Sequence, residues 1–493
     1  MSRTKGGTTT MLQKSLAAAV MMAAALPAWA GKDDIAKSVA GLADESWEMA
    51  KSIWEYAEPG YLETRSSKLI ADRLEKAGFK VSRGVAGIPT AFTATFGEGK
   101  PLVAILGEYD ALPELSQEAL PVRQPRKQGN GYGQACGHHL FGVGSMAAAM
   151  ALAGEIKAGR AKGTVRYYGC PAEEGGAAKA FMVRAGLFSD VDVALHWHPG
   201  SRNSVGDPSC LARIAVRFRF HGTAAHAAGS PERGRSALDG LLLAIHAVEL
   251  MREHTPTGTR LHHTILSGGG AANVVPEFAE GFFYVRHPKS EVVRELYPRL
   301  LKCAQAGALA TETKLEVVNL GGTLELLPNP SLSAVIQANM KKLNKLRYDD
   351  EETRFALKLR ETIPGKLPPL DDIATVHETY GGTTMGSTDV GDVSWVVPTA
   401  GFSAACWAPG TPGHSWQAVA CGGTTMGKKG MLLAAETLAA SAFDLMTNPE
   451  AIQNAKAEFK KKLGEDGYKP LLDKEQKPPL EYRLPARRAA GGE

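Results

Sequence analysis

The stretch Leu102-Val-Ala-Ile-Leu-Gly-Glu-Tyr-Asp110 is a continuous apolar run that leads into acidic residues. A short apolar run of this kind is typical of a β-strand that is buried on both faces. Two further apolar runs, at 164–168 and 191–195, are each followed by a polar motif. The motifs are Gly169-Cys-Pro-Ala-Glu-Glu-Gly-Gly176 and His196-Trp-His-Pro199. With the helical segments between them, these units predict an α/β fold with a central, mostly parallel sheet.

The pattern changes from about residue 210, where apolar and basic residues alternate as in a half-exposed strand. The predicted elements are a strand at 212–220, a helix at 236–252, strands at 264–266 and 281–285, a helix at 292–308 and a strand at 314–318. This order predicts a small α+β insert with an antiparallel sheet, after which the chain returns to the first domain. The expected divisions are a leader at 1–30, a first domain at 31–209 and 322–446, an insert at 210–321, and a charged surface tail at 447–493.

The first thirty residues predict export. Three basic residues precede an apolar run at 16–26, and Ala28-Trp-Ala30 follows it as a cleavage site, as in a secretory signal. We therefore expect a secreted protein, in the bacterial periplasm. Cleavage would remove three of the 56 basic residues and leave a net charge of +1 against 52 acidic residues. A nearly neutral mature chain predicts no nucleic-acid partner and no membrane association.

Cys136 and His138 lie two residues apart, directly before a helical run at 143–156. A thiolate and an imidazole at this spacing can bind one borderline-soft metal ion such as Zn²⁺. Cys-x-His also occurs by chance in loops, so this motif alone leaves the metal site open.

Glu173 and Glu174 follow a predicted strand in a glycine-rich loop. One carboxylate of such a pair can bind a cation while the other accepts a proton from water. The alternative is an exposed structural pair. Asp110 is similarly ambiguous, because it can cap a turn or orient a metal-bound imidazole.

His196 and His198 flank a tryptophan, so on a strand both would point to the same face. Either could bind a metal, or remain a core histidine. His414, in the turn-rich loop Gly410-Thr-Pro-Gly-His414, would return to the same rim, because ligands of parallel sheets bind at the carboxyl ends of the strands.

The insert carries three further candidates, His226, Asn273 and Arg286. An arginine can clamp a carboxylate through two hydrogen bonds. An imidazole or an amide can donate to a developing oxyanion. Spacing alone does not separate these roles from ordinary packing.

Together, these motifs resemble the aminoacylase/carboxypeptidase-type family of dimetal amidohydrolases and peptidases. The resemblance covers roughly residues 35–446. It rests on Gly107-Glu-Tyr-Asp-Ala-Leu-Pro113, Cys136-Gly-His138, the Glu173-Glu174 motif, Trp197-His-Pro199, Gly222-Thr-Ala-Ala-His226, Asn273-Val-Val-Pro276 and Ser387-Thr-Asp-Val-Gly-Asp-Val-Ser-Trp395. It implies a catalytic α/β domain interrupted by an α+β sandwich that serves as a dimerisation domain.

The resemblance also implies roles for individual residues. Cys136, as a bridge, would bind two divalent metal ions together with His138, Glu174 and His414, and either His196 or His198 would complete the set. Glu173 would be the general base, His226 would stabilise the oxyanion in the partner subunit, and Asn273 and Arg286 would hold the substrate carboxylate. The wider family has a histidine two residues before the aspartate, whereas this chain has Glu108 before Asp110.

The expected activity is hydrolysis of the amide bond of N-acyl or aroyl amino acids, with p-aminobenzoyl-glutamate as the first substrate to test. Two ions of Zn or Mn, with Co also compatible, would serve as cofactors. The expected assembly is a homodimer, or a hetero-oligomer with a homologous subunit. The alternatives are a dipeptidase or another deacylase on the same scaffold, and a periplasmic binding protein for carboxylated ligands.

Overall fold

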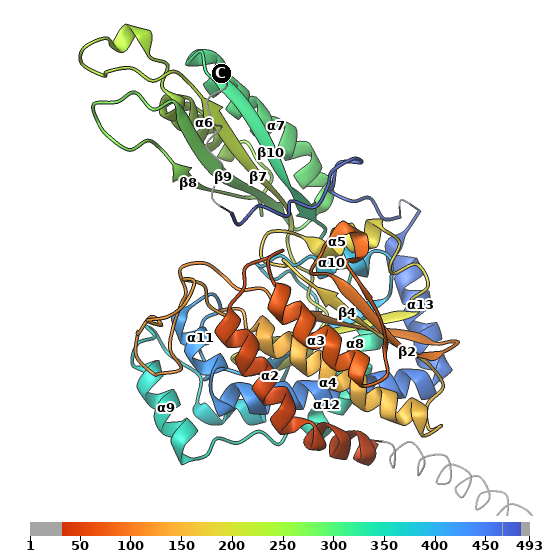
Figure 1. Cartoon of the computed structure of the whole chain (residues 1–493). Helices are drawn as coiled ribbons and strands as arrows, with labels where there is room; N and C mark the ends of the chain where they lie inside the picture. Colours follow the sequence, from red (N-terminus) through yellow and green to blue (C-terminus); the bar gives the residue numbers. More distant parts are fainter. Residues whose placement is uncertain (1–31, 466, 485–493) are drawn as a thin grey trace, which may run out of the picture.

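The computed structural model describes residues 32–465 and 467–484, which form a large domain and a small domain (Figure 1). The expected leader at 1–30 lies outside the described residues. Among the described helices, α4 (His138–Lys157) has the length and apolarity of a membrane span, but 83% of its apolar 18-residue stretch is buried within the protein. α4 is therefore a core helix.

The large domain is built on an eight-stranded sheet. Its strands are β1 (Lys80–Arg83), β2 (Phe92–Glu98), β3 (Leu102–Glu108), β4 (Gly163–Cys170), β5 (Val193–Gly200), β6 (Asn203–Gly206), β11 (Val376–Thr379) and β12 (Thr399–Ala405). They follow the order β1-β2-β4-β3-β5-β12-β6-β11. The central strands β4, β3, β5 and β12 are parallel, whereas β1 and β2 add an antiparallel edge. The predicted α/β fold with a mostly parallel sheet is confirmed.

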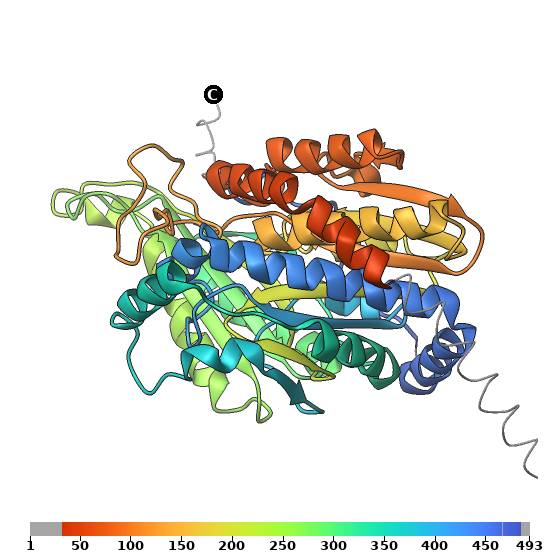
Figure 2. The same cartoon turned by 90° about the horizontal axis from the view of Figure 1, so that it is seen from below.

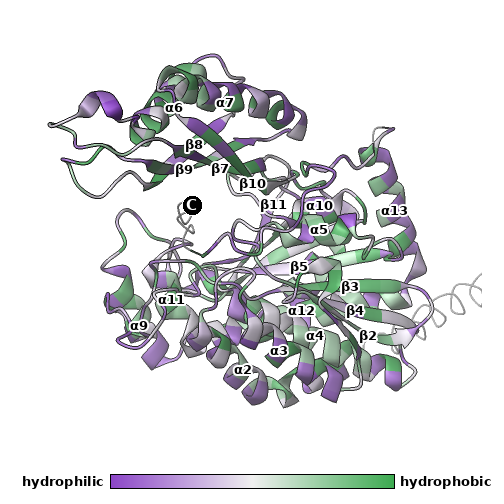
Figure 3. Cartoon of the chain, turned by 45° about the horizontal axis from the view of Figure 1, so that its top comes forward, coloured by the Kyte–Doolittle hydropathy of each residue, from purple (hydrophilic) through white to green (hydrophobic). Residues whose placement is uncertain are grey.

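Helices cover both faces of this sheet. Besides α4, they are α2 (Ala43–Tyr56), α3 (Thr64–Lys76), α5 (Ala178–Arg184), α8 (Pro330–Leu343), α9 (Asp350–Arg360), α10 (Val390–Ser394), α11 (Trp416–Gly422), α12 (Thr425–Thr447) and α13 (Pro449–Leu463). Val103 and Ile105 of β3 face the core shared with α2, α3, α4 and α12, which lie on one side in Figure 2. Ala104 and Leu106 face the core shared with α5 and α10. Burial on both sides explains why β3 is a continuous apolar run, and Figure 3 shows this strand largely in the hydrophobic colour.

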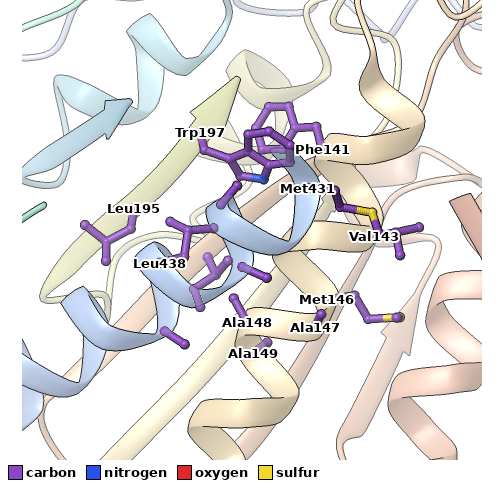
Figure 4. Packing of buried hydrophobic residues seen from close by; sticks show 14 of the residues in the cluster. Phe141, Val143, Met146, Ala147, Ala148, Ala149, Leu195, Trp197, Met431 and Leu438 are labelled. Atoms are coloured by element: carbon purple, nitrogen blue, oxygen red, sulfur yellow. The ribbon is translucent and has the colours of Figure 1, made fainter. Parts of the chain in front are cut away.

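Small residues allow α4 to pack closely against the sheet and against α12 (Figure 4). A Cβ atom at Gly142 would lie 2.6 Å from the backbone oxygen of Glu108. A Cβ atom at Gly144 would lie 2.9 Å from the ring of Trp197, which is fully buried. The close approach fixes the N-terminal turn of α4 against the carboxyl end of β3.

The small domain has an antiparallel sheet of four strands in the order β10-β7-β9-β8. Its elements are β7 (Ala212–His221), α6 (Ala237–Arg252), β8 (Arg260–Ser267), β9 (Phe278–His287), α7 (Ser290–Ala310) and β10 (Lys314–Thr323). The order of strands and helices is the predicted one. Helices α6 and α7 cover one face of the sheet, and we call the opposite face the open face.

The C-terminal segment differs from the surface tail expected at 447–493. Helix α13 packs against α8, and its residues Ile452 and Ala455 are buried. Residues 468–484, which we call the C-terminal strap, then cross to the small domain (Figure 1). Leu471 and Leu472 are buried there. A few apolar anchors within a charged, proline-rich sequence are enough to fix this segment.

We expect Gly142→Ala to lower the free energy of unfolding by about 1–3 kcal/mol, because the added methyl group would force α4 away from β3. Gly154→Ala is the matched control on the same helix, since a Cβ atom there meets nothing within 4 Å. That change is expected to stabilise by up to about 1 kcal/mol. Thermal denaturation of both variants tests the packing, and equal midpoints would contradict it.

Candidate active site

The predicted site residues converge on the carboxyl ends of the central strands. Asp110 follows β3, Glu173 and Glu174 follow β4, and His198 lies near the end of β5. The loop that precedes α4 brings Cys136 to the same rim. Because these strands are parallel neighbours, their carboxyl ends bring together residues that are far apart in the sequence.

Cys136 is shared by two groups of potential metal ligands. One group is Cys136, His138 and His198, and the other is Cys136, Glu174 and His414; within each group the ligand atoms lie within 4.8 Å of one another. Cys136 Sγ lies 3.2 Å from His198 Nε2, and His414 Nε2 lies 2.9 Å from Glu174 Oε1. The shared thiol occupies the position that a bridging ligand requires.

Local backbone geometry places these ligands. His138 is the first residue of α4, and Gly137 caps the helix with φ 76°. A Cβ atom at Gly137 would lie 2.7 Å from Pro199, so glycine is needed both for the conformation and for the close approach. His414 has φ 54°, and its backbone N–H donates to the oxygen of Ala135. A non-glycine residue in the left-handed region is an unfavourable conformation that functional sites often hold.

Asp110 is fully buried and orients the ligands rather than joining them. Its Oδ1 accepts a 2.8 Å hydrogen bond from His138 Nδ1, and its Oδ2 accepts one of 2.9 Å from the backbone N–H of Glu174. The first bond leaves Nε2 of His138 to face the centre of the cluster. A carboxylate in this position fixes the tautomer and the ring orientation of a ligating histidine.

The residues present fit a pair of metal ions. His138 Nε2 is buried without a hydrogen bond and lies 3.1 Å from Glu108 Oε2. The carboxyl group of Glu174 faces the same cluster, and its Oε1 lies 2.9 Å from His414 Nε2. Burial opposes ionisation of Cys136, but His198 and His138 hold the pKa of its thiol well below its usual value. A thiolate, imidazoles and a carboxylate are the ligands that Zn²⁺ prefers. The buried His138 Nε2, which has no hydrogen bond, is available as one of them.

The two adjacent glutamates differ in their environments. Burial, followed by the charges of Glu108 and Glu174, raises the pKa of Glu173 well above its usual value. Burial also acts on Glu174, but its hydrogen bond with His414 lowers the pKa to about 2. Neighbouring carboxyl groups whose pKa values are driven apart are suited to different tasks, one as a ligand and one as a base.

The two candidate histidines of β5 are separated by their positions along the strand. Both line a cavity of about 290 Å³ behind the rim. Only His198 reaches Cys136, whereas His196 packs against Gly401, where a Cβ atom would lie 2.3 Å from its ring. Burial lowers the pKa of His196 to about 3. His198 is therefore the histidine of the cluster.

Two of the three candidates of the small domain are not brought to the cluster within one chain. His226 and Asn273 lie on exposed neighbouring loops, where Ala227 N–H donates to the oxygen of Asn273. These loops project from the end of the small domain (Figure 1). Arg286 lies elsewhere, near the end of β9, and is half-buried. Asn273 and Arg286 therefore do not meet in a single chain.

Two features of the site were missed by the sequence analysis. Lys179 is fully buried and bonds Glu108 Oε1 and Asp389 Oδ1, each at 2.6 Å. Its signal was a charged residue in the first turn of the short helix α5, whose next four residues are apolar. In the C-terminal strap, the Tyr482 hydroxyl donates to the backbone oxygen of Glu174 at 2.9 Å, and Arg483 donates to the same oxygen. The composition of the strap gave no signal of this contact.

Residues 212–310 match the family model of the peptidase dimerisation domain. Over 437 residues the chain is 39% identical to a subunit of the p-aminobenzoyl-glutamate hydrolase of Escherichia coli K12, covering 83% of this chain and 91% of that protein. It is 29% identical over 433 residues to the Xaa-Arg dipeptidase of Mus musculus, covering 85% and 89%. The chain also matches the crystal structure of a Bacillus subtilis protein described as a dinuclear metal-binding peptidase from the M20 family. The TM-score is 0.51 at 16% identity, and the match covers 83% of this chain and 99% of that one.

The small domain is thus a peptidase dimerisation domain, inserted into an α/β domain whose rim gathers the candidate ligands. The relatives of the chain are hydrolases that act on amide bonds. The chain belongs to the M20 family of amidohydrolases and peptidases.

Proposed function

We propose that this chain hydrolyses the amide bond of N-acyl or aroyl amino acids, with p-aminobenzoyl-glutamate as its substrate. The relative that is 39% identical is named for that reaction. The observation that carries the proposal is the pair Glu173 and Glu174, one carboxyl with a raised pKa and one with a lowered pKa, beside a ready-made set of ligands.

Cys136, His138, His198, Glu174 and His414 would hold two divalent ions, either Zn²⁺ or Mn²⁺, with Co²⁺ also compatible with these ligands. When bound, such ions lower the pKa of water and polarise a carbonyl group. The shared position of Cys136 supports its assignment as the bridge.

Glu173 is suited to move the proton. Its carboxyl group is about nine-tenths buried, next to His138 and Glu108. In the proposed reaction the Glu173 carboxylate accepts a proton from the attacking water and returns it to the amide nitrogen of the departing amino acid. Because the tetrahedral intermediate is an oxyanion, it also requires a hydrogen-bond donor.

His226 of a second copy would supply that donor. Its Nδ1 accepts hydrogen bonds from the backbone N–H groups of Ala228 at 3.2 Å and Gly229 at 3.0 Å. Nε2 is therefore the protonated nitrogen, on a loop exposed at the end of the dimerisation domain. A pre-set donor that lies away from its own site supports a homodimer; a hetero-oligomer with a homologous subunit would use the same arrangement. Residues 1–30, as a secretory signal, support a periplasmic location.

Glu173→Gln is expected to lower kcat at least about 100-fold, because the amide keeps the shape of the side chain but does not accept the proton. Metal content should stay near that of the wild type. Glu174→Gln is the matched control, and it is expected to lose metal as well as activity. Glutamate release and elemental analysis measure the two quantities, and full activity of Glu173→Gln would refute the proposed mechanism.

A second prediction concerns assembly. Glu173→Gln and His226→Ala should each be inactive alone, but their co-expression should restore about a quarter of the wild-type activity. Half of the dimers are then mixed, and each mixed dimer retains one site with both residues intact. Activity of the co-purified mixture, compared with each variant alone, tests this. Absence of recovery in a verified mixed dimer would show that His226 acts within its own chain or not at all.

A further inference from the structure

Two arginines face each other across adjacent strands of the dimerisation domain. Arg213 of β7 and Arg286 of β9 are direct antiparallel partners in the sheet register. Side chains of such partners share one face and lie about 5 Å apart at Cβ, where like charges destabilise the sheet. Their neighbours Ala212 and Val285 belong to the core under α6 and α7, so the arginines point from the open face.

No carboxylate of the described residues forms an ion pair with either guanidinium. Arg213 is 6% exposed, and its Nε lacks a hydrogen bond, as does Nε of Arg286. Their contact is with the ring of Tyr284, which lies 5.2 Å from the guanidinium of Arg213 and 4.7 Å from that of Arg286. A buried charge without a partner is costly, so this pair requires an explanation.

The same strand shows that the sheet can neutralise its arginines. Arg217 pairs with Glu280 at 3.1 Å, and Arg219 pairs with Glu316 at 3.0 Å. Both lie on the open face, four and six residues beyond Arg213. Unpaired arginines are thus a feature of one end of β7 rather than of the whole strand.

That end of the strand faces the active site. The acidic groups that interact with Arg213 are Glu173, Asp389 and Glu174, and the first and last of these also interact with Arg286. The Tyr284 hydroxyl lies 3.7 Å from the position of a Cβ atom at Gly175, in the Glu173-Glu174 loop. These carboxylates already serve the ligand cluster and Lys179. An anion entering the site would meet both guanidiniums.

We propose that Arg213 binds the side-chain carboxylate of an acidic leaving amino acid, while Arg286 holds its α-carboxylate. This inference rests on the proposed function, because it specifies which residue recognises the acidic side chain of the departing amino acid. One α-carboxylate would neutralise only one of two adjacent guanidiniums, whereas glutamate or aspartate carries two carboxylates on a short chain. A guanidinium and a carboxylate match through two parallel hydrogen bonds.

The arrangement also discriminates against a basic leaving group. An arginine side chain, as in the substrates for which the mouse relative is named, would bring a third guanidinium beside two that lack partners. Like charges in a desolvated site oppose binding strongly. Arg213 and Arg286 therefore favour substrates with an acidic leaving amino acid over those with a basic one.

The test compares N-benzoyl-glutamate with N-benzoyl-glutamine, which has the same shape but a neutral side chain. The wild-type enzyme should prefer the glutamate compound by about 100-fold in kcat/KM. Arg213→Gln should lose most of this preference: activity falls about 100-fold on the glutamate compound, mainly through KM, and less than about threefold on the glutamine compound. Arg219→Gln, on the same strand and face, is the matched control and should retain the preference.

Binding measured without turnover separates this inference from the proposed function. In the metal-loaded Glu173→Gln background, calorimetry should show that Arg213→Gln weakens binding of N-benzoyl-glutamate but hardly affects N-benzoyl-glutamine. If the wild type hydrolyses neither compound, the proposed function fails, yet this selective loss of binding would still support the arginine pair. Equal losses for the two ligands, or a wild type without preference, would overturn it.

Thermal denaturation supplies a readout that a structural arginine would not give. Arg213→Gln should leave the midpoint unchanged or raise it, because one of two repelling, unpaired charges is removed. A clearly lower midpoint together with equal loss of both substrates would show that Arg213 supports the fold and does not read the substrate.

Discussion

The candidate active site depends on the buried side chain of Lys179, which partly neutralises a cluster of buried carboxylates. Lys179 lies between Glu108 and Asp389, with all three side chains almost completely removed from solvent. Burial opposes its charge, but the two carboxylates keep the pKa of Lys179 well above its usual value. Removing one member of such a buried arrangement leaves an uncompensated charge. β3, α5 and the loop before α10 are thereby fixed as one unit.

One lysine does not neutralise the whole rim. Burial and the charge of Asp110 raise the pKa of Glu63 to about 8, and burial with the neighbouring carboxylates raises that of Glu173. The surplus of negative charge makes cation binding favourable at the cluster that Cys136 shares. It also explains why the guanidiniums of Arg213 and Arg286 remain charged nearby without forming ion pairs of their own. The acidic rim and the basic end of β7 therefore attract each other.

The C-terminal strap fixes the distance between these two surfaces. Tyr482 binds the backbone oxygen of Glu174, and its own backbone oxygen accepts a hydrogen bond from Arg217 of β7. Further along, Arg294 of α7 donates to the oxygen of Pro470. The strap therefore joins the loop that carries Glu173 and Glu174 to the sheet that carries Arg213. These hydrogen bonds are to backbone atoms, which carry no pattern that a sequence reveals.

What the sequence predicted follows from the same physics. Continuous apolar strands and polar residues at their ends were sufficient to predict the sheet and its rim, whereas the ligand set around Cys136 came from the family resemblance and stays a prediction. The missing features depend on tertiary contacts: Lys179 has partners 71 and 210 residues away, and Arg213 belongs to an alternation that normally marks a half-exposed strand. His196 and His198 lie two residues apart on β5 and therefore point to the same face of the sheet, so the sequence pattern does not separate them. They differ only in which of them lies closer to the carboxyl end of the strand, where Cys136 is found. Residue types that can react or bind a metal ion are recognisable in a sequence, whereas the neighbours of Lys179 and Arg213 are defined only by the tertiary structure.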